Sequence, residues 1–187
     1  MTGTSVRSNR ATLVWETALR TLSLALASLL LLLGCGGGPD TSEDRAAAVD
    51  ALVQDLHLDY PGVVNVSPRE LMTLLEEPDR VVLVDVRTDD ERGVSTIPGA
   101  ISRMEFESGV EDLGDRRVVA YCTIGARSSQ FAREMAEFGI EVANLDGSIL
   151  AWTHAGGPLV SDGEETNRLH VYGSRWDLVP AGYEAVW

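Results

Sequence analysis

The chain of 187 residues carries 15 basic and 29 acidic side chains, a formal net charge of -14, and 44% hydrophobic residues, which suits one ordinary globular domain with attachments. Every basic residue is an arginine, so the sequence excludes chemistry that needs a lysine, such as a Schiff base or a phosphate-binding P-loop. The acidic balance argues against a surface for nucleic acid, because phosphate neutralisation needs clustered cations. The two cysteines cannot form a disulfide framework.

The N-terminal segment has the order of a secretion signal: basic residues first, then the apolar run 22–33, which ends at Gly34 and Cys35. This run is shorter than the ~20 residues that a transmembrane helix needs. Residues 18–34 would make a marginal span, so a retained membrane anchor stays an alternative.

The junction Leu32-Leu33-Gly34-Cys35 resembles the lipobox of bacterial lipoproteins. This resemblance implies that residues 1–34 are removed and that Cys35 is acylated. We therefore expect an exported protein that is lipid-anchored to a bacterial membrane on the periplasmic or cell-surface side, with a flexible tether over residues 35–47. The alternative is an ordinary signal peptide in which Cys35 is incidental.

The rest of the chain alternates between helical and extended patterns. Apolar spacing predicts a helix over 42–57, and a capping box with proline at its first helical position opens another over 67–77. Runs of β-branched and other apolar residues predict strands at 63–66, 81–86, 117–121 and 140–145, with a turn into a short strand at 97–101 and a helix over 128–138. Strands alternating with helices predict an α/β fold with a parallel sheet.

Cys122 follows the predicted strand 117–121, and ligands bind beyond the carboxyl ends of such strands. The loop after it contains Gly125 and leads into a helix, so backbone N–H groups and Arg127 would surround the sulfur with positive charge. These surroundings favour a thiolate over an inert buried cysteine.

The segment Cys122-Thr123-Ile124-Gly125-Ala126-Arg127-Ser128 resembles the C-x-x-G-x-R-S/T loop of the rhodanese family. Three further motifs occur in the family's order: Asp85-Val86-Arg87, Ile97-Pro98-Gly99-Ala100, and Leu145-Asp146-Gly147 followed by Trp152. The resemblance covers residues from about Val64 to Val160.

This resemblance implies a three-layer α/β fold, with a central, mainly parallel sheet and helices on both faces. It also implies a sulfurtransferase in which Cys122 takes sulfane sulfur from a donor such as thiosulfate, holds it as a persulfide, and passes it to a thiol or another nucleophile. Arg127 would orient the anionic donor, and the backbone amides of Thr123, Ile124, Gly125, Ala126 and Ser128 would stabilise the persulfide. By the same analogy, Asp85 and Arg87 would brace the loop, and Ser128 would cap the following helix.

Two positions depart from the family pattern. Thr96 replaces a frequent histidine, and Ser148 replaces the second of two glycines. We interpret both as structural positions that do not touch the cysteine loop.

Two other functions stay open. One is a phosphatase or an arsenate reductase. Phosphatases that share this fold have a longer loop than the four residues between Cys122 and Arg127, and the shorter loop suits sulfur better than phosphate. A reductase that cycles through a disulfide would need a second thiol, and Cys35 is the only other cysteine. A binding or persulfide-sensing module with little turnover is the second alternative.

We expect no cofactor and no metal, since the three histidines lack ligand spacing. The acidic run 89–91 is interpreted as a solvated helix start. The expected partners are a small sulfur-containing substrate, the membrane and a protein sulfur acceptor, with no nucleic acid.

The rhodanese-like domain is expected over 48–160. An aromatic-rich extension, 161–187, is expected to fold back on it, because disordered tails are poor in such residues. A partner-binding surface is the alternative for this extension.

Overall fold

The structure, a computed structural model, describes residues 41–109 and 113–187. The predicted signal peptide, the predicted lipidation site Cys35 and the first part of the predicted tether lie outside the described residues.

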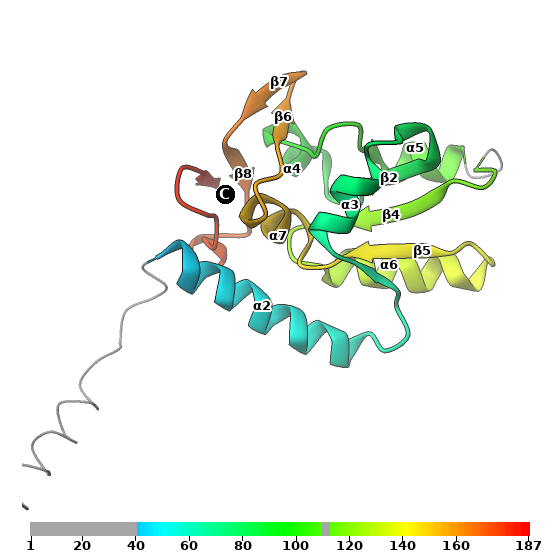
Figure 1. The fold of residues 1–187 in the computed structure, drawn as a ribbon, viewed down its shortest axis with the longest axis horizontal. Helices are drawn as coiled ribbons and strands as arrows, with labels where there is room; N and C mark the ends of the chain where they lie inside the picture. Colours follow the sequence, from blue (N-terminus) through cyan, green and yellow to red (C-terminus); the bar gives the residue numbers. More distant parts are fainter. Residues whose placement is uncertain (1–40, 110–112) are drawn as a thin grey trace, which may run out of the picture. The chain divides into compact units, whose positions relative to one another are not determined.

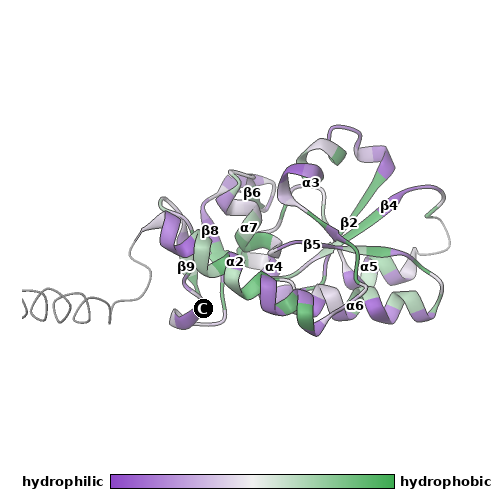
Figure 2. Cartoon of the chain, turned by 60° about the horizontal axis from the view of Figure 1, so that its bottom comes forward, coloured by the Kyte–Doolittle hydropathy of each residue, from purple (hydrophilic) through white to green (hydrophobic). Residues whose placement is uncertain are grey.

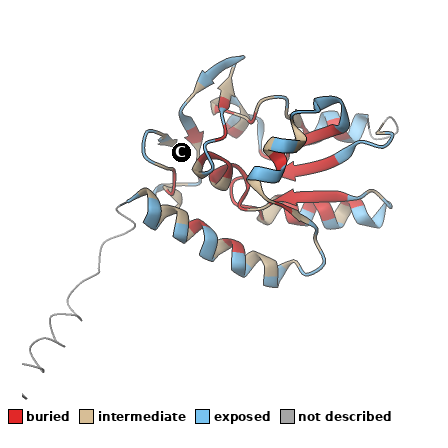
Figure 3. Ribbon diagram, in the orientation of Figure 1, coloured by how far each residue is buried: buried red, intermediate tan, exposed pale blue. Residues whose placement is uncertain are grey.

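A parallel sheet forms the centre of the described chain (Figure 1). Its strands are β1 (Asn65–Val66), β2 (Val81–Asp85), β3 (Ile101–Ser102), β4 (Arg117–Tyr121) and β5 (Val142–Leu145), in the order β1-β5-β4-β2-β3. Every neighbouring pair in this sheet is parallel. The central strands are buried on both faces, as their uninterrupted apolar sequences predict (Figure 3).

Helices cover both faces of the sheet, so the predicted α/β class with a mainly parallel sheet is confirmed. One face packs against α2 (Ser42–Asp59), α3 (Pro68–Leu74) and α7 (Ser148–His154). The other face packs against α5 (Arg103–Ser108) and α6 (Ala126–Glu137). Strand side chains alternate between the two cores: Leu83 and Val119 face the first, whereas Val84 and Ala120 face the second.

Polar and apolar residues are distributed accordingly. Figure 2 shows hydrophobic colour along the central strands, whereas the helices around them carry both hydrophobic and hydrophilic colour. Phe106 of α5 and Phe131 of α6 meet edge to face beneath the second face of the sheet, with ring centroids 5.7 Å apart.

Capping boxes open several helices. The predicted box at Ser67 and Glu70 opens α3, and equivalent boxes open α2, α5 and α4 (Asp89–Val94). Thr41 caps α2, so this helix begins at Ser42, inside the range 35–47 that we predicted to be a tether. Residues 42–47 therefore belong to the folded part. The short helix η1 (Pro78–Arg80) joins the turns after α3 to β2.

The C-terminal extension packs on the same core as α2 and α7. The strand β6 (Leu159–Ser161) ends at the first residue of this extension and pairs antiparallel with β7 (Glu164–Thr166). The extension also contains the parallel pair β8 (Arg168–His170) and β9 (Glu184–Val186), and the short helix η3 (Ser174–Trp176). Its buried residues in the first core cluster are Leu169, Val171, Leu178 and Val179.

Hydrogen bonds also tie this extension to α2. The Arg45 guanidinium donates to the Val179 carbonyl at 2.9 Å, and the Ala181 N–H donates to Ser42 Oγ at 2.8 Å. The two ends of the described chain thus stabilise each other. Within residues 41–109 and 113–187, no helix has the length and apolar character that a membrane span requires.

Candidate active site

Cys122 lies where β4 passes into α6, at the carboxyl end of the sheet. The connection is tight because Gly125, the residue before α6, has φ +124°, a conformation that side-chain-bearing residues rarely adopt. Glycine therefore lets the loop return toward the sulfur.

Three donors surround the sulfur of Cys122. The Gly125 N–H donates to Sγ at 3.1 Å, and the hydroxyls of Ser128 and Ser148 approach it at 3.6 and 3.9 Å. The cysteine itself is only 2% exposed. The start of α6 adds the positive end of a helix dipole.

These donors determine the ionisation of the thiol. Burial alone raises the pKa of Cys122, but hydrogen bonds from the backbone and side chain of Ser128 and from the backbone of Gly125 outweigh it. Arg127 adds a further favourable charge, and the pKa is lowered from its ordinary value. The environment therefore favours the nucleophilic thiolate.

Ser148 contacts the cysteine loop, so our interpretation of this position as remote from the loop is wrong. Its Oγ accepts the Cys122 backbone N–H at 3.0 Å. The residue follows Gly147 and itself has φ +51°, in the left-handed region that disfavours side chains. Thr96, the other departure, instead bonds Tyr121 Oη and Asp85, away from the sulfur.

Ser128 does not cap α6, contrary to the prediction. The helix begins at Ala126, two residues earlier than predicted, and its N-cap residue Gly125 has no side chain to offer. Ser128 is buried within the first turn, and its hydroxyl donates to Asn144 Oδ1 at 2.6 Å. Asn144, from β5, in turn donates through Nδ2 to Asn65 Oδ1 at 2.8 Å. A polar network absent from the predictions thus lies beneath the sulfur.

Arg127 is held by a carboxylate. Its Nη1 and Nη2 each donate to Glu91 at 2.7 Å, in a bidentate pair. Burial raises the pKa of Glu91, but the Arg127 pair and the hydrogen bonds of Thr88 outweigh this and lower it to about 2. Glu91 is therefore buried and ionised, whereas we predicted a solvated residue; its neighbours Asp89 and Asp90 are exposed.

A small cavity of about 160 Å³ opens beside Cys122. The loop residues Thr123, Ile124, Ala126 and Arg127 line it, and the extension contributes Tyr172 and Trp176. The Arg127 guanidinium lies over the Tyr172 ring, 5.0 Å from its centroid. The sequence offered no signal that these two aromatic residues reach the cysteine.

Asp85 and Arg87 form a buried pair that supports the strand end. Arg87 donates to Asp85 through Nε at 2.9 Å and Nη2 at 2.6 Å, and to the Ser95 carbonyl at 2.6 Å. Tyr121, the residue before Cys122, donates its hydroxyl to Asp85 at 2.7 Å. The pair thus reaches the cysteine loop through Tyr121.

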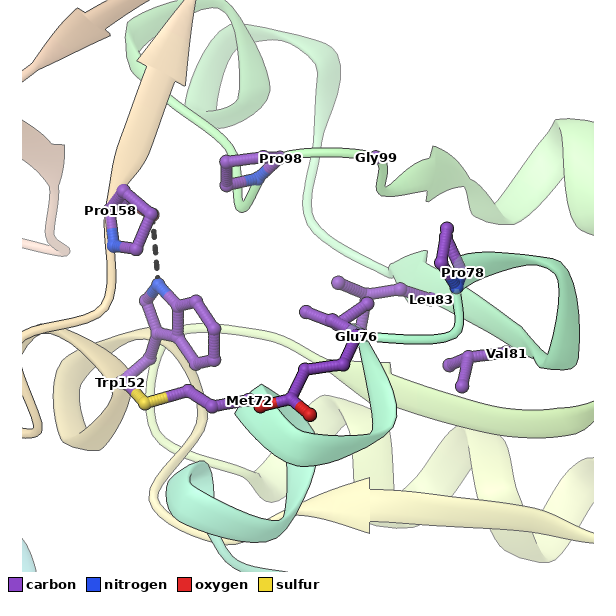
Figure 4. A pocket seen from close by; sticks show the side chains of 10 residues that line it. Met72, Glu76, Pro78, Val81, Leu83, Pro98, Gly99, Trp152 and Pro158 are labelled. Carbon is purple, nitrogen blue, oxygen red and sulfur yellow. Dashed lines mark hydrogen bonds between the residues drawn. The ribbon is translucent and has the colours of Figure 1, made fainter.

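A larger cavity of about 450 Å³ lies elsewhere in the domain, beside Met72 and Trp152 (Figure 4). The Trp152 indole N–H donates to the Pro158 carbonyl at 2.9 Å. Glu76 is the ionisable residue in its lining, and no cysteine or histidine is present there. In the described part of the chain, no group of three metal-binding side chains occurs.

Comparisons with known proteins match residues 67–155 to the rhodanese-like domain. A sulfurtransferase of Allochromatium vinosum is 35% identical over 103 residues, which cover 53% of this chain and 96% of that protein. The putative sulfurtransferase YtwF of Bacillus subtilis is 30% identical over 93 residues, or 48% of this chain and 90% of that protein.

Among solved structures, a thiosulfate sulfurtransferase from Pseudomonas aeruginosa is 26% identical, with a TM-score of 0.49, over 73% of this chain and 26% of that one. The sequence match to nearly the whole of the Allochromatium protein, together with the matched domain, shows that the chain belongs to the rhodanese-like family.

Proposed function

We propose that the protein is a sulfurtransferase that carries sulfane sulfur on Cys122. The observation that supports this most directly is the buried sulfur, 3.1 Å from the Gly125 N–H at the start of α6, with its pKa lowered. The names of the Allochromatium and Bacillus relatives agree with sulfur transfer.

The reaction needs two displacements. The Cys122 thiolate attacks the outer sulfur of a donor such as thiosulfate, a new S–S bond forms, and sulfite leaves with the electron pair of the broken bond. A thiol or another nucleophile, on a small molecule or a protein, then attacks the terminal sulfur and regenerates the thiolate. Neither step needs an oxidant or a metal.

The loop supplies the stabilisation for both steps. The backbone N–H groups of Gly125 and Ser128, which both lower the pKa of the Cys122 thiol, can also donate to a persulfide anion. Because these N–H groups are held in the loop and the first turn of α6, they need no reorganisation during the reaction.

A turnover assay tests this function. The full chain is incubated with thiosulfate and cyanide or a thiol, and sulfite release is followed beside the Cys122→Ser protein. Release that depends on Cys122 supports the proposal. If no sulfur is transferred from thiosulfate, a persulfide or polysulfide, the proposal is wrong.

The low solvent accessibility of Cys122 favours a second candidate function. Because Cys122 is 2% exposed and its cavity is small, a module that accepts sulfur but passes it on slowly is the second candidate. Stoichiometric loading without multiple turnovers would identify such a persulfide-sensing protein.

We further propose that the protein is exported and lipid-anchored through Cys35, followed by a tether and the folded domain. The support is the order of arginines, apolar run and Leu-Leu-Gly-Cys junction in the sequence. Intact mass of membrane-extracted protein should show an acyl modification that Cys35→Ala abolishes. An unmodified Cys35 would contradict this proposal.

A further inference from the structure

We propose that the C-terminal extension makes the Cys122 site selective for sulfane-sulfur donors of low charge, with alkyl hydropersulfides as the preferred class and thiosulfate as a poor donor. Tyr172 and Trp176 are the specificity-determining residues. This inference rests on the proposed sulfur transfer through Cys122 and narrows its substrate.

The cavity presents mainly carbon to a ligand. Ile124 and Ala126 line it from the loop, and Tyr172 and Trp176 line it from the extension. The two aromatic residues lie beyond residues 67–155, which match the family domain. They therefore add to the common loop a mainly apolar wall, which favours contact with an alkyl group over burial of a sulfonate.

The cation beside the sulfur is already compensated. Both Nη groups of Arg127 donate to Glu91 at 2.7 Å, and Nη2 also lies 3.2 Å from Thr123 Oγ1. Glu91 stays ionised because its pKa is about 2. The pair is therefore neutral, and a dianion entering next to the Cys122 thiolate meets no net positive charge from it.

Two further charges act on an approaching donor. Arg175 lies over the Trp176 ring at 5.9 Å, but its side chain is exposed, so water and salt screen its charge. The formal net charge of the chain is -14, which repels a dianion more strongly than a neutral or singly charged molecule.

The chemistry of a hydropersulfide suits this environment. The Cys122 thiolate attacks the terminal sulfur of the protonated R–S–SH, an S–S bond forms between Sγ and that sulfur, and the S–S bond of the donor breaks. The thiolate R–S⁻ leaves with the electron pair and takes up the proton, so the products are the Cys122 persulfide anion and R–SH. One negative charge is present before and after the step, whereas thiosulfate brings three charges together.

The test compares two donors on the full chain. Second-order rate constants for sulfur loading of Cys122 are measured by intact mass with thiosulfate and with an alkyl hydropersulfide generated in situ. The variants are Tyr172→Ala, Trp176→Ala and Glu91→Gln, and the matched control is Trp187→Ala, an exposed aromatic of the same extension.

We expect each aromatic variant to lose about tenfold in loading by the hydropersulfide and less than twofold by thiosulfate. Glu91→Gln keeps a capping side chain but frees the Arg127 charge, so loading by thiosulfate should rise severalfold. The control should change neither rate. If Trp176→Ala fails to fold, Tyr172→Ala alone tests the selectivity. Because Tyr172 is 58% exposed, we expect its truncation to leave the fold intact.

Failure of the selectivity and failure of the proposed function give different results. If both donors load Cys122 but the ratio of their rate constants is the same in Tyr172→Ala as in the parent protein, the selectivity is wrong and sulfur transfer stands. The same holds if thiosulfate loads and the hydropersulfide does not. If neither donor loads Cys122, both proposals fail.

Discussion

Two cavities in the described residues, one beside Met72 and Trp152 and one beside Cys122, differ in size and in chemistry, and the smaller one holds the nucleophile. The Met72–Trp152 cavity has about 450 Å³ and no nucleophile, whereas the Cys122 cavity has about 160 Å³ and holds the sulfur. The larger cavity borders Val81, at the start of β2, while Cys122 follows the last residue of β4. In this fold, the carboxyl ends of the strands and the start of a helix supply the chemistry.

Trp152→Ala gives the largest expected effect on stability. Trp152 is 2% exposed, its ring packs against Gly157, and its N–H donates a hydrogen bond to the Pro158 carbonyl. Its truncation should lower the free energy of unfolding by about 3–5 kcal/mol, measured by urea denaturation. Sulfur loading of the protein that remains folded should stay within twofold of the parent. A tenfold loss of loading in folded protein would show that the larger cavity takes part in the reaction.

Glu91→Gln should have the next largest effect, and the effect should depend on pH. The folded pKa of Glu91 is about 2, against an ordinary value of 4.5. Its carboxylate therefore stabilises the fold fully above pH 4.5, and this contribution is lost as the pH falls toward 2. We expect a difference in unfolding free energy of up to about 3 kcal/mol at pH 7 that shrinks below pH 4.5. A difference that is constant with pH would contradict the ion pair with Arg127.

Ser128→Ala should raise the pKa of Cys122, because the side chain of Ser128 is one of the groups that lower it. The rate of alkylation of Cys122 as a function of pH measures this. The parent protein should show a midpoint below the ordinary value of about 8.5 for a cysteine. Ser129→Ala, at the neighbouring buried serine, is the control and should leave the midpoint in place. If the alkylation midpoints of the parent and of Ser128→Ala are equal, Ser128 does not affect the ionisation of Cys122.

Ser148→Gly should have the smallest effect on stability. Glycine relieves the left-handed strain, worth about 1 kcal/mol, but leaves the Cys122 N–H without its acceptor, so the two effects offset each other. The melting temperature should move little, while the alkylation midpoint of Cys122 shifts because Ser148 positions the backbone at the sulfur. A stabilised protein with an unchanged alkylation profile would show that Ser148 has no role in the chemistry.

Local sequence patterns predicted the strands and the loop that carry Cys122 better than the side chains that surround it. The β-branched runs at Val81 and Arg117 identified buried parallel strands, and the glycine loop placed Cys122 at a strand end. These signals are local, because strand burial and turn geometry depend on neighbouring residues.

The contacts that the sequence did not predict join residues far apart in the chain. Glu91 reaches Arg127 across 36 positions, and Ser148 reaches Cys122 across 26. The acidic run 89–91 predicted the start of a helix, but not that the carboxylate of Glu91 turns inward to Arg127. The placement of Tyr172 over Arg127 depends on how the extension packs, which no local periodicity records.

Intact-mass analysis of the full chain before and after a sulfane-sulfur donor tests the central claim most directly. The account predicts a gain of one sulfur atom per chain, lost on treatment with a thiol and absent in Cys122→Ser. A hydropersulfide and thiosulfate are both used as donors, so that a poor donor is not mistaken for an inactive site. Sulfur retained on Cys122→Ser, or no gain with either donor, would contradict the assignment of Cys122 as the sulfur carrier.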